Sequence, residues 1–432
     1  MRIRLDIPLT LSQITDCDKD AVIEYISTDT REISAGDLFI PLRGRAFNGQ
    51  DFIPEAMARG ALVLDTNDGA LDFLKIARLY KTKLKGLKYT VGITGSVGKT
   101  TAKEFIYKIA SLKYRSHKTF SNENNIIGVA KTILTSQKNT ESLIIEVGTN
   151  HIGEIKRIAD VIRFDIALIT NIGTSHIGNF GTRDAIAREK LCIASDGETR
   201  LISRYEDALG GFTFSAEDPC ADLHIEKQGD EVNIYKGGRL FLKCGCPFSE
   251  KHLLEEISAA ASVCHLMKMS SEELNPGISS LSYDNTRQKF IKLKNFSILS
   301  DCYNASLESF KSSFDTISAM KDHEYYSAVI GDIDELSNMS ESIHYELGKR
   351  LAFYNFRRIY LIGDMQEVIK DGYKSILGNA DALLIFDKTK TVSDIADTII
   401  KCCMENEIIL FKASRKMRFE VIIDEIIRRC KN

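Results

Sequence analysis

The stretch VGITGSVGKTTAKEF, residues 91–105, decides the fold of the middle of this chain. A short apolar run leads into Gly95, Gly98 and Lys99, and a helical pattern follows. Glycines let backbone N–H groups curl around phosphates, and the N-terminus of the next helix adds partial positive charge. A strict Walker pattern would need glycine at position 93, where this chain has Ile93. The strand–loop–helix context nevertheless favours a phosphate loop over a glycine-rich turn with a chance lysine.

The residues around this loop predict a nucleotide and a metal ion. Lys99 can reach the β- and γ-phosphates, and Thr100 can supply a hydroxyl ligand to magnesium. Glu146, at the end of the next strong strand LIIEVG, stands where a metal-binding carboxylate belongs, although a lone carboxylate there could instead cap a helix. The helix after the loop is expected to bury one side, made of Phe105, Ile106, Ile109 and Leu112.

Two further residues stay undecided on their local sequence alone. His176 lies in TNIGTSHIGNFGT, just after a predicted strand, at the edge where parallel sheets bind ligands. Lys190 lies in AIAREKLCI, on a predicted helix. A surface histidine and a solvated lysine are the ordinary interpretations of such residues.

Composition limits the kinds of protein this can be. The chain has 432 residues, 44% of them hydrophobic and 27% charged, as in a soluble globular protein of two or three domains. With 57 basic and 60 acidic residues, it predicts no general affinity for nucleic acid or anionic membrane. The ten cysteines are scattered, and only Cys244 and Cys246 resemble a ligand pair, so free thiols in a reducing cytosol are expected. Asp6 and Pro8 interrupt any signal peptide, and no apolar run is long enough to span a membrane, which predicts a cytoplasmic protein.

The hydrophobic pattern predicts an α/β protein of three domains. Residues 1–85 are expected to form a small α/β domain, and KTKLKGLK, residues 81–88, a linker. Residues 86–297 alternate buried strands such as SLIIEVG and DIALITNIG with helical stretches such as GEIKRIADVIR, which predicts a parallel-sheet, phosphate-loop ATPase domain. Residues 298–432 predict a Rossmann-like domain without GxGxxG, with strands at FSILSD, YSAVIGD, RIYLIGD, ALLIFD and EIILFKAS.

Motifs along the whole chain resemble those of the Mur ligase family, the ATP-dependent amide-forming enzymes of peptidoglycan synthesis. In order, they are STDTREISAGDLFIPLRG, TGSVGKTTAKEF, NENNIIGVA, EVGTNHIGEI, TNIGTSHIGNFGT, TRQKF, SDCYNAS, VIGDIDELSNMSESIHYELG and FKASRKMRFE. Each motif is modest evidence, whereas the ordered set is highly specific. A motor or switch NTPase has no reason to carry the first and last of them.

The resemblance implies a role for each candidate residue. ATP would be bound by Gly95, Ser96, Val97, Gly98, Lys99, Thr100, Thr101, Arg287, Asp301, Tyr303 and Asn304. Two magnesium ions would be held by Thr100, Glu146, His176 and Lys190, with Lys190 carbamylated, and Lys99, His176 and Lys190 would be catalytic. The substrates would be bound by Thr30, Arg31, Asn48, Asn125, Lys412 and Ser414.

In the reaction that the resemblance implies, ATP converts a carboxylate into an acyl phosphate, which an amine then attacks. The expected substrates are ATP, D-alanyl-D-alanine and UDP-N-acetylmuramoyl-tripeptide, whose third residue, diaminopimelate or lysine, stays open. The first domain would hold the UDP group, the second ATP and the third the dipeptide. Closure of the domains would keep water from the acyl phosphate. The protein is expected to act as a monomer, without nucleic acid and without a membrane span.

Three departures from the family pattern keep other functions open. Asn48–Gln50 reads NGQ in place of Asp-Gly-His, Glu256 replaces an asparagine that is normally near the adenine, and Ala413 replaces a glycine. A buried change from amide to carboxylate could loosen nucleotide binding. One alternative is a related ligase that acts on another carboxylate and amine. The other is a nucleotide-binding partner protein with degenerate catalysis, against which the intact phosphate-loop and metal residues argue.

Overall fold

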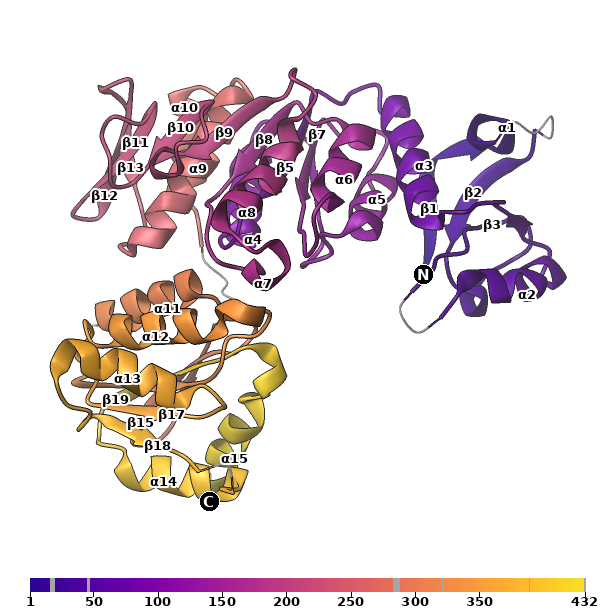
Figure 1. Ribbon diagram of the computed structural model, residues 1–432. Coiled ribbons are helices and arrows are strands. Elements are labelled where there is room, and N and C mark those ends of the chain that lie inside the picture. The colour runs from indigo at the N-terminus through magenta and orange to yellow at the C-terminus, as the bar shows by residue number, and fades with distance from the viewer. Residues whose placement is uncertain (16–19, 45–46, 283–287, 321, 388, 431–432) are drawn as a thin grey trace. The chain divides into compact units, whose positions relative to one another are not determined.

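The computed structural model describes residues 1–432 except 16–19, 45–46, 283–287, 321, 388 and 431–432. The described residues contain three β-sheets, of four, nine and six strands, with helices between the strands (Figure 1). This confirms the predicted α/β class. The chain forms two compact units: residues 1–172 with 187–281, and residues 173–186 with 282–432.

The first sheet is the small N-terminal one. Its strands, in spatial order, are β1 (Arg2–Thr10), β2 (Val22–Ser27), β3 (Leu38–Phe39) and β4 (Leu62–Val63). The pair β1–β2 is antiparallel, and the other two pairs are parallel. Ile33 and Phe39 form a small core with Ala56 of helix α2 (Ile53–Ala58).

Helix α3 (Gly69–Lys83) connects this sheet to the next one. It packs on α5 (Ile126–Leu134) and α6 (Glu154–Ile162), and the fully buried Tyr80 donates a hydrogen bond to the Ser136 carbonyl at 2.7 Å. The prediction of a linker over 81–88 is therefore wrong for its first three residues, which end α3. The Lys81 ammonium donates to the Ile162 carbonyl at 3.0 Å, at the end of α6, where unpaired helix carbonyls attract a cation.

The nine-stranded sheet is the largest. Its strands are β5 (Tyr89–Thr94), β6 (Ser116–Lys118), β7 (Ser142–Glu146), β8 (Ile166–Ile169), β9 (Arg200–Arg204), β10 (Phe212–Ser215), β11 (Leu223–Gln228), β12 (Glu231–Lys236) and β13 (Arg239–Gly245). The spatial order is β13-β12-β11-β10-β9-β8-β5-β7-β6. The strands from β6 to β11 are parallel, and β12 and β13 extend the sheet as an antiparallel ribbon. Every residue of β7 and β8 is buried, as their apolar sequences predict.

Three helices, α4 (Lys99–Ala110), α9 (Lys251–Leu266) and α10 (Ser271–Ser279), pack against one another in this unit. Helix α4 buries Phe105, Ile106 and Ile109, as expected. The prediction for Leu112 is wrong, because α4 ends at Ala110 and the leucine side chain beyond it is 56% exposed.

The six-stranded sheet forms the C-terminal region. Its strands, in spatial order, are β14 (Lys289–Lys292), β15 (Phe296–Asp301), β19 (Glu407–Lys412), β16 (Tyr325–Ile330), β17 (Arg358–Leu361) and β18 (Leu383–Ile385). The five predicted strands are confirmed and are parallel, and β14 adds an antiparallel edge that the sequence did not indicate. One face is covered by α11 (Leu307–Ala319), α12 (Ser340–Leu351) and α13 (Gln366–Leu377), and the other by α14 (Val392–Cys402) and α15 (Glu420–Cys430) (Figure 1).

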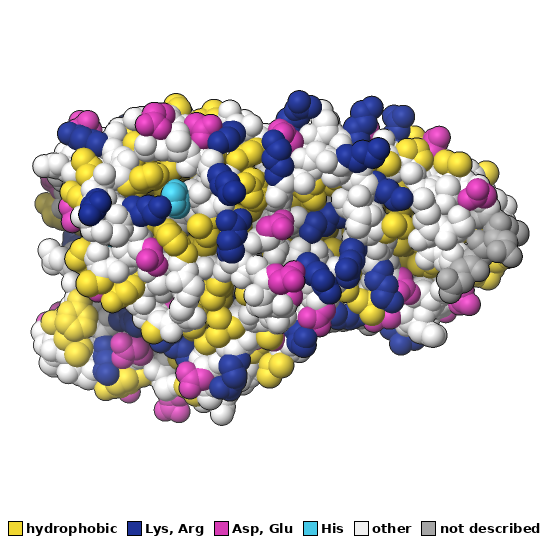
Figure 2. All heavy atoms as spheres, turned by 90° about the horizontal axis from the view of Figure 1, so that it is seen from above, with side chains coloured by type: hydrophobic (Ala, Val, Ile, Leu, Met, Phe, Trp, Pro, Cys, Tyr) yellow, Lys and Arg dark blue, Asp and Glu magenta, His cyan; other side chains and the backbone are white. Residues whose placement is uncertain are grey.

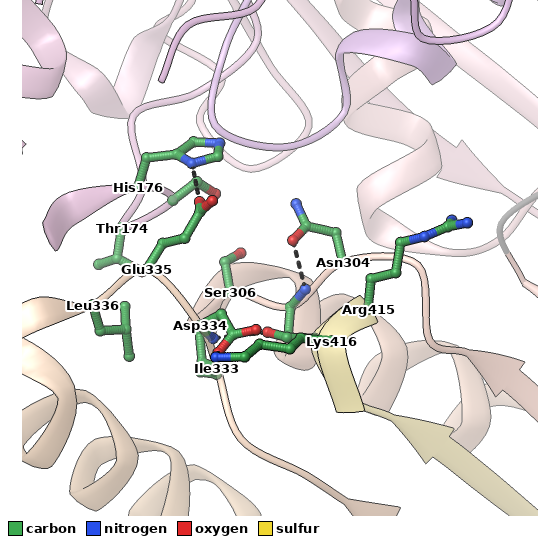
Figure 3. Close-up of a pocket in the computed structure, with 13 residues that line it drawn as sticks. Thr174, His176, Asn304, Ser306, Ile333, Asp334, Glu335, Leu336, Arg415 and Lys416 are labelled. Carbon is green, nitrogen blue, oxygen red and sulfur yellow. Dashed lines mark hydrogen bonds and ion pairs between the residues drawn. The ribbon is translucent and has the colours of Figure 1, made fainter. Parts of the chain in front are cut away.

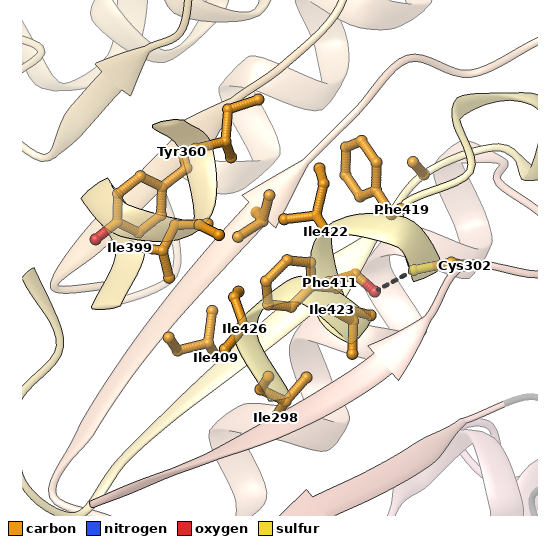
Figure 4. Close-up of a cluster of buried hydrophobic side chains, with 14 of the residues drawn as sticks. Ile298, Cys302, Tyr360, Ile399, Ile409, Phe411, Phe419, Ile422, Ile423 and Ile426 are labelled. Carbon is orange, nitrogen blue, oxygen red and sulfur yellow. Dashed lines mark hydrogen bonds between the residues drawn. The ribbon is translucent and has the colours of Figure 1, made fainter. Parts of the chain in front are cut away.

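The core beneath α14 and α15 explains one of the sequence departures. Phe411 of β19 packs there with Phe419, Ile422 and Ile426 (Figure 4). Ala413 is fully buried in the same cluster, and a Cβ atom added at Gly331 would lie 2.7 Å from the Ala413 methyl group. The methyl group of Ala413 therefore fits in this core, since Gly331 opposite it has no side chain.

The surface carries charges of both signs. On the face shown in Figure 2, lysine and arginine side chains alternate with aspartate and glutamate. Within the described ranges, no helix is both long enough and apolar enough to cross a membrane.

Candidate active site

The phosphate loop lies between β5 and α4 and is held by residues that follow β8. The Thr170 hydroxyl donates to the Val97 carbonyl at 2.6 Å, and the Asn171 side-chain oxygen accepts from the Val97 amide at 3.1 Å. Gly95 has φ +151°, and a Cβ atom there would lie 1.9 Å from the Thr170 hydroxyl oxygen. Glycine is required at this position, and the loop shape is fixed by its neighbouring strand.

Lys99 begins α4 and turns back over the loop. Its ammonium donates to the carbonyls of Gly95 at 2.6 Å and Ser96 at 3.2 Å. Thr100 and Thr101 follow in the first turn of the helix. The loop therefore combines a fixed cation with a helix N-terminus, both of which favour a bound anion.

Thr100 and Glu146 lie together at the start of α4, although they are 46 positions apart. The threonine hydroxyl is 3.0 and 3.2 Å from the two carboxylate oxygens of the buried Glu146. Hydroxyl and carboxylate oxygens suit magnesium, which usually takes few protein ligands and completes its shell with phosphates and water. Among the described residues, no group of three or more His, Cys, Asp or Glu could hold a metal ion. Thr100 and Glu146 place one hydroxyl and one carboxylate together in this unit.

Two neighbours of Glu146 were missed by the sequence reasoning. The Asn124 amide donates to Glu146 at 2.9 Å, and the fully buried Lys103 ammonium lies 3.5 Å from its carboxylate. Lys103 also donates to the Ser121 carbonyl at 2.6 Å. Lys103 lies three positions after Thr100 and so on the same side of α4, a spacing that could have identified it.

Lys190 of α8 (Arg183–Leu191) is not a solvated lysine. Its side chain is almost completely buried, and burial, followed by the charge of Lys99, lowers the pKa of its amine well below the usual value. The adjacent Glu189 opposes this lowering. Glu189 accepts hydrogen bonds from the backbone amides of Gly153 at 2.7 Å and Ile155 at 2.9 Å, which fixes α8 against the start of α6. The structure thus brings the phosphate loop, Glu146 and Lys190 together in one unit.

His176 belongs to the other unit, where it has an unusual backbone. Its φ is +60°, in the left-handed region that few residues other than glycine adopt, and it precedes the short helix α7 (Ile177–Phe180). Its Nδ1 atom is paired with the carboxylate of Glu335 (Figure 3). Thr174, two residues earlier, donates its hydroxyl to Glu308 of α11 at 3.0 Å.

A pocket of about 170 Å³ lies beside His176 in this unit. Its walls are loops that follow β15, β16 and β19 at the carboxyl edge of the parallel sheet, where ligands of such sheets collect. Charges of both signs line it, as Figure 3 shows: Asp334 and Glu335, and Arg415 and Lys416. Predicted site residues His176, Asn304 and Ser414 also line it.

Hydrogen bonds and ring contacts join the predicted residues of this unit around the pocket. The Lys412 ammonium, almost completely buried, donates to Asp301 at 2.7 Å and to the Asn304 carbonyl at 3.3 Å. The Ser414 hydroxyl oxygen accepts from the Asp334 amide at 2.8 Å. The Arg415 guanidinium lies 5.2 Å above the Tyr303 ring. Arg287 lies outside the described residues.

The predicted substrate residues of the first unit take part in local structure. Thr30 donates to Glu55 at 2.9 Å, and the Arg31 guanidinium donates two hydrogen bonds to Asp29, at 2.9 and 2.6 Å. Asn48 caps a short helix, and Asn125 caps α5 by accepting from the Gly128 amide at 2.9 Å. Their roles toward a substrate stay predictions.

Comparisons with known proteins match two segments of the chain to Mur ligase families and align nearly the whole chain with a named relative. The family description "Mur ligase middle domain" matches residues 93–235, and "Mur ligase family, catalytic domain" matches residues 22–82. The chain is 29% identical to the UDP-N-acetylmuramoyl-tripeptide–D-alanyl-D-alanine ligase of Bacillus subtilis (strain 168), over 95% of this chain and 94% of that protein.

Two solved structures have the same fold. One is a crystal structure of MurF from Acinetobacter baumannii, with a TM-score of 0.84 and 24% identity, covering 99% of this chain and 100% of that one. The other is MurF ligase from Thermotoga maritima in complex with ADP, with a TM-score of 0.79 and 24% identity, covering 94% and 97%.

Proposed function

Because this chain belongs to the Mur ligase family, we propose that it joins D-alanyl-D-alanine to UDP-N-acetylmuramoyl-tripeptide by ATP-dependent amide formation. This is the reaction named for the Bacillus subtilis relative, which aligns over nearly the entire length of both chains. One observation carries the proposal: a lysine-bearing phosphate loop opens beside the paired oxygens of Thr100 and Glu146. The product would be a precursor of peptidoglycan, made in the cytoplasm by a monomer.

The chemistry requires a carboxylate to be activated before an amine can attack it. Transfer of the γ-phosphoryl group of ATP would give an acyl phosphate, and the amine of the dipeptide would then expel phosphate. Such transfer is catalysed mainly by positioning and by neutralising charge. The loop amides would hold the phosphates, and Lys99 would stabilise the charge that develops on them. Magnesium, when bound by Thr100 and Glu146, would neutralise further phosphate charge.

Lys190 would contribute through a modified side chain. A neutral amine can add to carbon dioxide and form a carbamate, and the lowered pKa of Lys190 favours its neutral form. The carbamate would place a carboxylate in the same unit as the phosphate loop, as a ligand for a second magnesium ion. His176 would be a further ligand of the metal ions.

The remaining site residues divide among the three substrates. Thr30, Arg31 and Asn48 would receive the uridine nucleotide at the N-terminal sheet, with Asn125 in the substrate cleft. Lys412 and Ser414 would line the site of the dipeptide, and Arg287, Asp301, Tyr303 and Asn304 would contact ATP. The domain limits at residues 85 and 297 are part of the same proposal.

Phosphate release from ATP tests this function directly. Purified protein would be given ATP and magnesium with D-alanyl-D-alanine, with the UDP-tripeptide in its diaminopimelate or lysine form, or with both substrates. We expect rapid release only when both substrates are present, and one tripeptide form should be preferred. Release with a different amine or carboxylate instead would indicate a related ligase. Binding of ADP without release under any combination would indicate a nucleotide-binding partner protein.

A further inference from the structure

Glu256 of α9 lies against the turn of the phosphate loop. Its side chain is only 7% exposed, and a Cβ atom built at Gly98 would lie 1.7 Å from one of its carboxyl oxygens, Oε1. Gly98 also has φ +84°, so both the backbone and the space occupied by Glu256 require glycine there. The carboxyl group therefore lies directly beside the loop that would hold the nucleotide.

The neighbouring carboxylate, Glu255, serves a different purpose. It accepts hydrogen bonds from the Arg204 guanidinium at 2.9 Å and from the Ala216 amide at 2.7 Å, and so ties α9 to the central sheet. The Oε2 atom of Glu256, by contrast, is buried without a hydrogen-bond partner in the part of the chain that the structure describes. A buried carboxyl oxygen without a partner is costly, so such atoms usually have one. A ligand bound in the loop would supply it.

Burial is the main reason that Glu256 is neutral near physiological pH. Burial and the charge of Glu255 raise the pKa of the Glu256 carboxyl to about 8, against the opposing charges of Arg204 and Lys99. A neutral carboxylic acid has one O–H donor and one carbonyl acceptor, whereas a carboxylate only accepts and would repel phosphate oxygens.

We propose that Glu256 is a nucleotide-binding residue that, as a neutral carboxylic acid, donates a hydrogen bond to the nucleotide held in the phosphate loop. The inference rests on the proposed use of ATP. If so, Glu256 does not weaken nucleotide binding below pH 8, but it makes the affinity for the nucleotide depend on pH. Affinity would be full while Glu256 is protonated and would fall as the pH rises above about 8.

Calorimetric titration with Mg-ADP between pH 7 and 9.5 tests the proposal, and it needs neither acceptor nor turnover. If Mg-ADP binds only when Glu256 is protonated, the Kd of the parent should rise by up to about 30-fold over this range. Glu256→Gln keeps a donor and an acceptor without the ionisation, so its Kd should change less than about threefold. Glu272→Gln, at an exposed position of α10, is the control and should follow the parent.

Each outcome decides a separate question. Equal loss of affinity in the parent and in Glu256→Gln would assign the effect to another group, such as Lys190, and overturn the proposal. A parent affinity that is constant across the range would do the same. Absence of ADP binding at pH 7 in both proteins would overturn the proposed use of ATP itself. Thermal melting gives a second readout: Glu256→Gln should gain Tm relative to the parent at pH 9 and less at pH 6.5, since only the parent must ionise a buried carboxyl.

Discussion

The phosphate loop and the C-terminal pocket occupy the same place in two different sheets. Each lies where a parallel strand ends and a helix begins, β5 and α4 in one unit and β15 and α11 in the other. In the first, glycines expose backbone amides, and the shape of the loop is held by hydrogen bonds between Val97 and residues after β8. In the second, charged side chains of both signs line the cavity. One topological position thus yields either a glycine-rich loop with exposed amides or a cavity lined by charges of both signs.

The two units also use their lysines differently. Lys99 lies on the carbonyls of its own loop, where an arriving phosphate can replace those contacts. Lys412 is buried against Asp301, whose carboxylate also accepts from the Ser313 hydroxyl at 2.5 Å. The first arrangement is suited to catalysis, and the second to maintaining the walls of a pocket.

Replacing Lys99 should have the largest effect on activity. Lys99→Ala removes the cation that would stabilise the transferred phosphoryl group, and we expect turnover to fall by about 1000-fold or more. The thermal melting temperature should stay near that of the parent, because the Lys99 ammonium donates hydrogen bonds to carbonyls of its own loop. Phosphate release and melting would be measured together, with Lys108→Ala on the same helix as a control. Turnover near the parent rate would remove Lys99 from the mechanism.

Lys190→Ala tests whether a modified side chain acts beside the loop. Activity should fall by about 100-fold or more if its carbamate holds a metal ion, because a charge-stabilising group is lost. Added acetate or formate should restore part of the rate by supplying a carboxylate. The same acids should not rescue Lys99→Ala, which lacks a cation instead. An active Lys190→Ala enzyme would exclude the role.

In the second unit, Lys412→Met should lower the stability of the fold. It leaves Asp301 buried without its cation, which is expected to cost about 3 kcal/mol of the free energy of unfolding. Urea unfolding, followed by tyrosine fluorescence, would measure the loss. Lys311→Met, at an exposed position of α11, should change stability by less than about 0.5 kcal/mol. Equal stability of the two variants would contradict a supporting role for the Asp301–Lys412 pair.

The smallest effects should come from the two helix caps. Asn125→Ala removes the cap of α5, and Ser306→Ala removes the cap of α11, whose hydroxyl accepts from the Ser309 amide at 3.2 Å. Each should cost about 1 kcal/mol. If Asn125 also contacts substrate, its variant should lose activity beyond what its melting temperature explains. If activity and melting temperature fall in proportion in both variants, Asn125 acts only as a helix cap.

Much of the fold was predictable because the order of apolar and polar residues along short segments determines which of them form strands and helices. Apolar runs predicted β7, β8 and the five parallel strands of the C-terminal sheet. Every residue of β7, β8 and β19 is buried, which explains why their apolar runs are continuous. Errors arose at the ends of elements. The residues Lys81–Lys83 continue α3 because carbonyls of a distant helix accept the Lys81 ammonium, and Leu112 is exposed because α4 ends two residues earlier.

The sequence by itself determined the phosphate loop, since glycines, a lysine and a helix start must be adjacent along the chain to form one. Only the tertiary structure decided that Thr100 meets Glu146, that Lys103 and Lys190 are buried, and that Glu256 fills the space beside Gly98. Burial and hydrogen bonding between residues far apart in the sequence depend on how helices pack on the sheet. No local pattern records that packing, which lowers the pKa of the Lys190 amine and raises the pKa of the Glu256 carboxyl.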